Sequence, residues 1–240
     1  MKHWVIPDIH GCVDTLKTLF EDYIKPSASD HIYFLGDYID RGPGGKEVID
    51  FIISLQKKAF NVVPLMGNHE DYLLRAYRYD SESKPFLGIK TKSGIQKEWE
   101  KQGGGATLKS FSVKWPAEIP GEYINWIMSL PFYHELEKFI LVHAGFNFEI
   151  ENPFEDKNYM LWVRDFAILP EKINHKKIIH GHVPVDLEFI DKTIRSEDQP
   201  FIDLDNGIYL SNRNGYGNLV ALELTEMKYV IQPCLDEINY

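Results

Sequence analysis

Two aspartates and an arginine stand close together in the segment GDYIDRG, residues 36–42, which directly follows the apolar run HIYFL. Charged side chains are rarely buried unless they are paired or bind a metal ion. Asp37, Asp40 and Arg41 therefore need compensating partners from elsewhere in the chain.

Four more polar clusters occupy the same kind of position, each after an apolar, strand-like run. They read PDIHG, GNHE, HAG and HGH and begin at residues 7, 67, 143 and 180. Together with the first cluster they offer six oxygen and nitrogen donors: Asp8, His10, Asp37, Asn68, His143 and His182. Such a mixed set suits manganese, iron or zinc better than calcium, which prefers oxygen ligands alone. The sequence therefore predicts a metal centre, in which Asp8 and His10 project to the same side of an extended strand.

Two ions that share the carboxylate of Asp37 would use these donors economically. Two divalent ions against the carboxylates of Asp8 and Asp37 leave a local charge of about +2, which can attract an anion although the whole chain carries −10. A water molecule between ions about 3.5 to 4 Å apart loses a proton near neutral pH and can attack phosphorus in line. The cluster thus predicts hydrolysis of a phosphate ester.

Further side chains are suited to hold the phosphate and to protonate the leaving group. Arg41 and Arg164, the latter in LWVRD, can bind phosphoryl oxygens through their planar donor groups. A surface salt bridge with Asp165 is the alternative for Arg164. His69 can act as general acid, with Asp40 orienting its ring and favouring the charged form.

The first third of the chain alternates strand-like and helix-like runs, beginning with the strand candidate HWVI and a helix for which Asp14 is a candidate N-cap. This order favours a parallel sheet, and open α/β sheets bind ligands at their strand ends. Residues 80–120 are expected to form an insertion with a short helix, and a hairpin is expected around Glu137. Five strand-like runs follow KKIIHGH: LEFI, FIDLD, GIYLS, LVALEL and KYVIQP.

Length and composition limit the remaining possibilities. The chain has 240 residues, of which 44% are hydrophobic, enough for a single domain over residues 1–240. No apolar run approaches the roughly 20 residues that span a bilayer, and the first strand-like run begins at His3, so we expect a cytoplasmic protein without membrane contact. The net charge of −10 and the lack of a basic block argue against nucleic acid. Cys12 and Cys234, at opposite ends of the chain, argue against a disulfide framework or a cysteine zinc site.

The order and spacing of the motifs resemble those of the PPP-type serine/threonine phosphatases of the calcineurin-like metallophosphoesterase superfamily, in particular their small bacterial and phage members. The shared pattern runs from DIHG through GD-x-x-DRG, GNHE and HAG to the late GH. WEKQGGGATLKSF, residues 99–111, also resembles a segment of small prokaryotic members and of the related symmetrical dinucleoside tetraphosphate hydrolases. The resemblance implies an α/β (α+β) fold, a four-layer α/β/β/α sandwich.

The resemblance also implies a role for each candidate residue. One ion would be bound by Asp8, His10 and Asp37, and the second by Asp37, Asn68, His143 and His182. Manganese is the expected metal, with iron or zinc as alternatives. His69 would be the general acid supported by Asp40, while Arg41, Arg164 and Asn68 would bind the substrate phosphate.

Three functions remain open from the sequence. The first is a serine/threonine protein phosphatase, a phosphoric monoester hydrolase in which hydroxide attacks phosphorus directly, without a phosphoenzyme. The second is a symmetrical bis(5'-nucleosyl)-tetraphosphate hydrolase, because the motifs read the phosphoryl group and not the leaving group. The third is an inactive metal-site module that binds proteins, which would be expected to have lost His69, Arg41 or a ligand. The expected partner is a phosphorylated protein or peptide or a small phosphoester, and the oligomeric state stays open.

Overall fold

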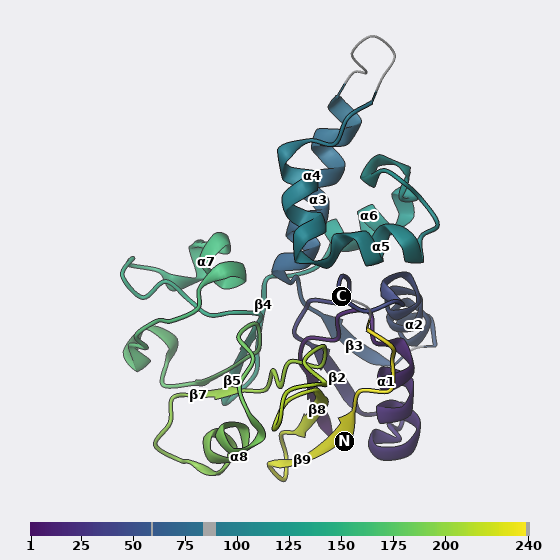
Figure 1. Ribbon diagram of the computed structural model, residues 1–240. Helices are drawn as coiled ribbons and strands as arrows, with labels where there is room; N and C mark the ends of the chain where they lie inside the picture. The colour runs from purple at the N-terminus through teal and green to yellow at the C-terminus, as the bar shows by residue number, and fades with distance from the viewer. Residues whose placement is uncertain (59, 84–89, 239–240) are drawn as a thin grey trace.

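Two β-sheets pack face to face, and helices lie on the outer side of each (Figure 1). The computed structural model describes residues 1–58, 60–83 and 90–238. Within these residues the mixed α/β architecture that the motifs imply is confirmed.

The first sheet contains the strands of the early β-α alternation. Its five strands are β1 (His3–Ile6), β2 (His31–Phe34), β3 (Asn61–Pro64), β8 (Asn218–Glu223) and β9 (Lys228–Pro233). They lie in the order β3-β2-β1-β8-β9, and β1, β2 and β3 are parallel, as predicted. The late runs LVALEL and KYVIQP form β8 and β9; β8 pairs antiparallel with β1, and β9 pairs antiparallel with β8.

The second sheet comes from the later part of the chain. Its four strands are β4 (Tyr133–Glu135), β5 (Phe139–Val142), β6 (Lys177–His180) and β7 (Phe201–Asp203), in that order. β4 and β5 form the hairpin expected around Glu137, and β5, β6 and β7 are parallel. Buried side chains from both sheets, among them Val5, Leu141 and Ile179, form one apolar cluster. Burying each such side chain contributes roughly 1.5 to 3 kcal/mol, so this shared core holds the two sheets together.

Helices cover the outer face of each sheet. The first sheet carries α1 (Val13–Thr18), its π-helical continuation Leu19–Ile24, and α2 (Gly45–Lys57), and α7 (Lys157–Trp162) packs on the outer face of the second (Figure 1). The remaining helix, α8 (Leu187–Arg195), packs beside β7 and contributes side chains to the cluster between the sheets. Short 3-10 turns occur at Pro153–Glu155 and Pro170–Ile173. None of the helices in the described part of the chain is long and apolar enough to cross a membrane.

A group of helices rises from the end of β3, away from the sheets (Figure 1). It contains α3 (Asn68–Glu82), α4 (Gly94–Trp99), a π-helical stretch at Glu100–Gly104, α5 (Gly105–Ser110), a 3-10 turn at Pro116–Glu118 and α6 (Gly121–Met128). The expected insertion at residues 80–120 therefore holds more helix than the single short one predicted, and its residues 84–89 lie outside the described residues. Trp99 is fully buried at the junction with the sheets.

Two of the late strand predictions are wrong. LEFI forms the first turn of α8, because the Asp186 side chain caps this turn by accepting the Phe189 backbone N–H at 2.8 Å. Ile190 and Ile194 then follow the helical spacing into the core. GIYLS forms a turn instead of a strand, beginning at Gly207 with φ +59°.

The start of α1 also differs from the prediction. Asp14 lies in the first turn and does not cap the helix. Instead, Asp236 in the C-terminal segment accepts the backbone N–H groups of Asp14 and Thr15 at 3.1 and 3.0 Å. This packing brings the sulfur atoms of Cys12 and Cys234 to 3.9 Å from each other, although the sequence places them at opposite ends; both thiols are free.

Candidate active site

The candidate metal ligands follow the carboxyl ends of five strands. β1 leads to Asp8 and His10, β2 to Asp37, β3 to Asn68, β5 to His143 and β6 to His182. The structure brings all six side chains together at one edge of the sandwich. Parallel strands place their carboxyl ends at the same edge of a sheet, which explains how residues so distant in sequence can meet.

Asp37 lies at the centre of this cluster. Its Oδ2 is 3.6 Å from His10 Nε2, and its Oδ1 is 3.5 Å from His143 Nε2. Asp8 Oδ2 lies 4.0 Å from the same His10 nitrogen. The two oxygens of Asp37 therefore face two separate groups of donors.

In the group of donors on the Oδ1 side of Asp37, the lone pair of His143 Nε2 faces an oxygen acceptor. His143 Nδ1 donates to the Leu35 carbonyl at 3.0 Å, so a neutral ring keeps its lone pair on Nε2. That Nε2 lies 2.8 Å from Asn68 Oδ1, and His182 Nδ1 lies 3.1 Å from the same oxygen. The buried Nε2 of His182 has no hydrogen-bond partner in the described part of the chain. Donor atoms that converge in this way suit a bound cation.

Burial favours the neutral form of the three cluster histidines, His10, His143 and His182. It lowers the pKa of His10 and of His143, and with the neighbouring His143 it lowers the pKa of His182 to about 3. His10 Nδ1 donates to the Ile39 carbonyl at 3.1 Å, which leaves Nε2 directed at the cluster. Neutral imidazole is the form that binds metal ions.

Three buried carboxylates lie close enough together to repel one another. Asp8, Asp37 and Asp205 are each at most 2% exposed. Burial and the negative charges of Asp205 and Asp37 raise the pKa of Asp8 well above its usual range, and burial raises the pKa of Asp205 to about 7. Nearby cations would relieve this repulsion, so the residues present fit the ions that the sequence predicts. The sequence prediction omitted Asp205, although FIDLD has the same pattern of a carboxylate after an apolar run.

His69 and Asp40 form a buried pair beside the cluster. His69 Nδ1 lies 2.6 Å from Asp40 Oδ2, and Asp40 is fully buried. Trp99 Nε1 donates to Asp40 Oδ2 at 2.8 Å, and the Thr107 hydroxyl donates to Oδ1 at 2.5 Å. Both donors come from WEKQGGGATLKSF, and the sequence prediction assigned neither of them a role.

Arg41 connects the cluster to this same segment. Its guanidinium nitrogens lie 2.8 Å from His10 Nε2 and 3.2 Å from His69 Nε2. The guanidinium group stacks on the ring of Tyr209, 3.8 Å from its centroid. The Arg41 backbone N–H donates to Gly103 O at 3.3 Å, and a Cβ on Gly103, whose φ is +107°, would lie only 2.5 Å from Arg41 N. Glycine therefore permits the close approach of the two loops.

Glu70 and the backbone fix the shape of the loop after β2. The Glu70 carboxylate accepts the backbone N–H groups of Asp37 and Tyr38, both at 2.8 Å.

Five residues of the site have left-handed backbone with φ between +47° and +74°: His10, Asp37, Asp40, Arg41 and His182. Such conformations cost about 1 to 3 kcal/mol each in non-glycine residues and concentrate at functional sites.

Arg164 lies outside the buried cluster. It is exposed in the loop after α7 and forms no hydrogen bond or ion pair with another described residue, so the alternative salt bridge with Asp165 is not formed either. Burial and the neighbouring His143 are the main causes that lower the pKa of His182, and the positive charge of Arg164 lowers it further. Arg164 therefore lies near His182.

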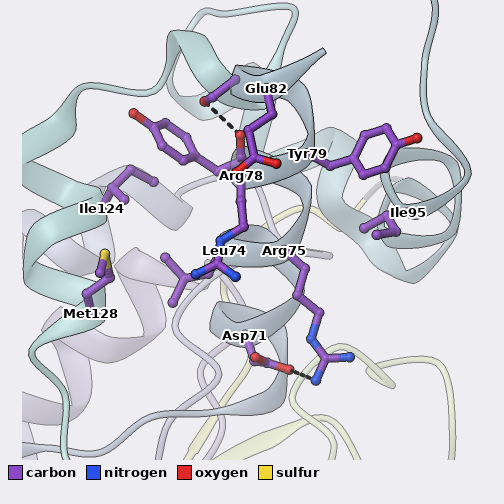
Figure 2. A pocket seen from close by; sticks show the side chains of 11 residues that line it. Asp71, Leu74, Arg75, Arg78, Tyr79, Glu82, Ile95, Ile124 and Met128 are labelled. Atoms are coloured by element: carbon purple, nitrogen blue, oxygen red, sulfur yellow. Dashed lines mark hydrogen bonds and ion pairs between the residues drawn. The ribbon is translucent and has the colours of Figure 1, made fainter.

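Figure 2 shows a separate pocket of about 670 Å³ among the helices above the sheets. Leu74, Ile124 and Met128 form its apolar side, and Asp71 and Arg75 form an ion pair at 2.6 Å at one end. None of the candidate ligands lines this pocket. It is therefore distinct from the cluster around Asp37.

Known proteins share both the sequence pattern and the fold. A symmetrical bis(5'-nucleosyl)-tetraphosphatase of Serratia proteamaculans is 30% identical over 147 residues, which cover 60% of this chain and 43% of that protein. The protein of the same name from Buchnera aphidicola subsp. Schizaphis graminum is 28% identical over 189 residues, with coverages of 73% and 59%. The chain thus spans about half the length of the curated relatives it matches.

A solved structure extends the likeness over nearly the whole chain. A serine/threonine phosphatase from Saccharomyces cerevisiae superposes with a TM-score of 0.62 at 16% identity and covers 97% of this chain and 79% of its own. At this identity the likeness shows a shared fold. The family model described as calcineurin-like phosphoesterase matches residues 1–215. With the candidate metal-binding residues gathered at the strand ends, the chain belongs to the calcineurin-like phosphoesterase family of metal-dependent hydrolases.

Proposed function

We propose that the protein hydrolyses a symmetrical dinucleoside tetraphosphate into two nucleoside diphosphates. The curated relatives from two bacterial genera bear the name of this activity, which favours it over the phosphoprotein hydrolysis that the motifs alone put first. The observation that supports the chemistry is the convergence of buried carboxylates and imidazole lone pairs beside Arg41 and His69.

The ligand roles follow from the two faces of Asp37. Asp8, His10 and one Asp37 oxygen would hold one ion. The other Asp37 oxygen, with Asn68, His143 and His182, would hold the second. Manganese is the ion to test first, with iron and zinc as alternatives. When bound, two such ions supply a water molecule that is deprotonated near neutral pH.

The chain's own residues then handle the charge and the leaving group. The oxygen of water forms a bond to one of the two central phosphorus atoms, and the bond from that phosphorus to the central bridging oxygen breaks. The bridging oxygen leaves with the second nucleoside diphosphate, and no phosphoenzyme forms. Arg41 binds the phosphoryl oxygens, and His69, held by Asp40, gives its proton to the departing oxygen. Arg164 adds positive charge on the His182 side.

A second candidate function is hydrolysis of phosphoserine or phosphothreonine. The buried His69–Asp40 pair favours it, because a serine or threonine alkoxide is a far poorer leaving group than a phosphate and depends more on a positioned acid. The third alternative, an inactive binding module, is disfavoured because His69, Arg41 and all six candidate ligands are present.

A substrate panel with added manganese tests the proposal. We expect kcat/KM for diadenosine tetraphosphate to exceed that for a phosphothreonine peptide and for p-nitrophenyl phosphate by about tenfold or more, with ADP as the product. Faster turnover of the phosphopeptide would put the protein phosphatase first. Activity on none of the three, with manganese, iron or zinc, would favour the binding module.

A further inference from the structure

A second pocket, of about 400 Å³, opens directly beside Arg41. Its walls are Arg41, Tyr209 and the segment that contains Glu100, Lys101, Gln102, Gly103, Gly105 and Ala106. Ligand pockets of small molecules start at about 300 Å³, so this space is large enough for part of a nucleotide. None of the six candidate metal ligands lines it.

Arg41 places this pocket on the side where the leaving group departs. The Arg41 guanidinium lines the pocket and also lies 3.2 Å from Nε2 of His69. His69 is the residue that gives a proton to the departing oxygen. A leaving group that receives this proton is therefore next to Arg41, at the entrance of the pocket.

The walls combine groups that suit a nucleoside diphosphate. Arg41 carries positive charge at the wall. The two other charged wall residues are each ion-paired with a residue outside the pocket, Glu100 with Lys92 at 2.5 Å and Lys101 with Glu98 at 3.1 Å. Gln102 has an amide that can both donate and accept hydrogen bonds, as the edge of a base requires. The ring of Tyr209, on which the Arg41 guanidinium stacks at 3.8 Å, adds an aromatic wall beside this charge.

From this geometry we infer that the pocket formed by Arg41, Tyr209 and residues 100–106 is the subsite for the nucleoside diphosphate leaving group. The inference rests on the proposed function, because only a dinucleotide substrate has such a leaving group. The part of the substrate that stays with the attacked phosphorus lies outside this subsite. The Gly-rich segment thus has two tasks, since Trp99 and Thr107 at its two ends also hold Asp40.

Gly105 offers a substitution that fills the pocket and leaves the fold intact. It is the first residue of α5, has right-handed helical backbone with φ −61° and ψ −34°, and a Cβ built on it would have no atom within 4 Å. Gly105→Phe therefore adds a ring at the pocket wall without strain. Gly121, the first residue of α6, has equally open surroundings and does not line the pocket, so Gly121→Phe is the matched control.

Two measurements on the wild-type protein and both variants test the subsite. The first is the ratio of kcat/KM for diadenosine tetraphosphate to kcat/KM for p-nitrophenyl phosphate with manganese, in which the small ester reports an intact catalytic centre. The second is the binding of ADP by calorimetry without added metal. We expect Gly105→Phe to lower the ratio and the ADP affinity about tenfold or more, and Gly121→Phe to keep both at the wild-type level.

The outcomes separate the subsite from the proposed function. If Gly105→Phe and Gly121→Phe give the same ratio and the same ADP affinity, the subsite is wrong even when the dinucleotide is the preferred substrate. If the wild-type protein cleaves p-nitrophenyl phosphate but not the dinucleotide, the proposed function fails. In that case, ADP binding that is lost only in Gly105→Phe supports a nucleotide site here, and ADP binding that is absent or equal in all three proteins overturns it.

Discussion

The two carboxylates of GDYIDRG have different partners, and this difference separates their roles. Asp37 faces His10 on one side and His143 on the other, at 3.6 and 3.5 Å. Asp40 pairs with His69, at 2.6 Å. The two negative charges of this segment therefore have separate candidate roles: Asp37 as the ligand shared by two ions, and Asp40 as the partner of the candidate general acid His69.

Substitutions at Asp37 and His69 should have different effects on metal content. Asp37→Asn removes the charge between the two donor groups, so we expect loss of most bound manganese together with activity. His69→Asn leaves every candidate ligand in place, so we expect full metal content and a turnover lower by about 100-fold or more. Elemental analysis after manganese loading and gel filtration, combined with kcat, distinguishes the two. Full metal content in Asp37→Asn would contradict the bridging role.

At the scale of elements, apolar runs followed by polar clusters predicted the strands that matter for the site. HWVI and HIYFL form β1 and β2, and their ends hold Asp8 and Asp37 as expected. LEFI failed because a four-residue apolar run does not distinguish a strand from one helical turn. The contacts of Asp40 with Trp99 and Thr107 could not be predicted from the sequence, for a different reason. They depend on how the helical segment packs on the sheet, across 59 and 67 residues of chain.

The segment of residues 99–111 should affect catalysis, because Trp99 and Thr107 donate hydrogen bonds to Asp40. Trp99→Phe keeps an aromatic ring but removes the N–H that donates to the buried carboxylate. A hydrogen bond to a charged group contributes about 1.5 to 3 kcal/mol, so we expect a similar loss in the free energy of unfolding. We also expect kcat to fall by about tenfold for alkyl phosphates, which need an acid, and to fall less for p-nitrophenyl phosphate.

The matched control for this prediction is Trp126→Phe. Trp126 Nε1 donates to Gln56 in an exposed hydrogen bond, so its loss should change stability and turnover little. Urea unfolding and the pH profile of kcat for both ester types provide the readouts. An equal fall for both esters, with an unchanged pH profile, would show that Trp99 has only a structural role.

At the scale of the whole molecule, the C-terminal segment returns to the start of the first helix and creates a pair of thiols. The hydrogen bond between the two thiols lowers the pKa of Cys234 to about 7, while the same contact and burial raise the pKa of Cys12 far above its usual range. The thiolate is the reactive form, and its fraction increases as the pH rises through the pKa.

We therefore expect iodoacetamide to modify Cys234 first, with the rate reaching half its maximum near pH 7, as measured by mass spectrometry. Cys12→Ala removes this hydrogen-bond partner and should move the midpoint towards the ordinary value of about 8.5. An unchanged midpoint in that variant would mean that Cys12 does not set the reactivity of Cys234.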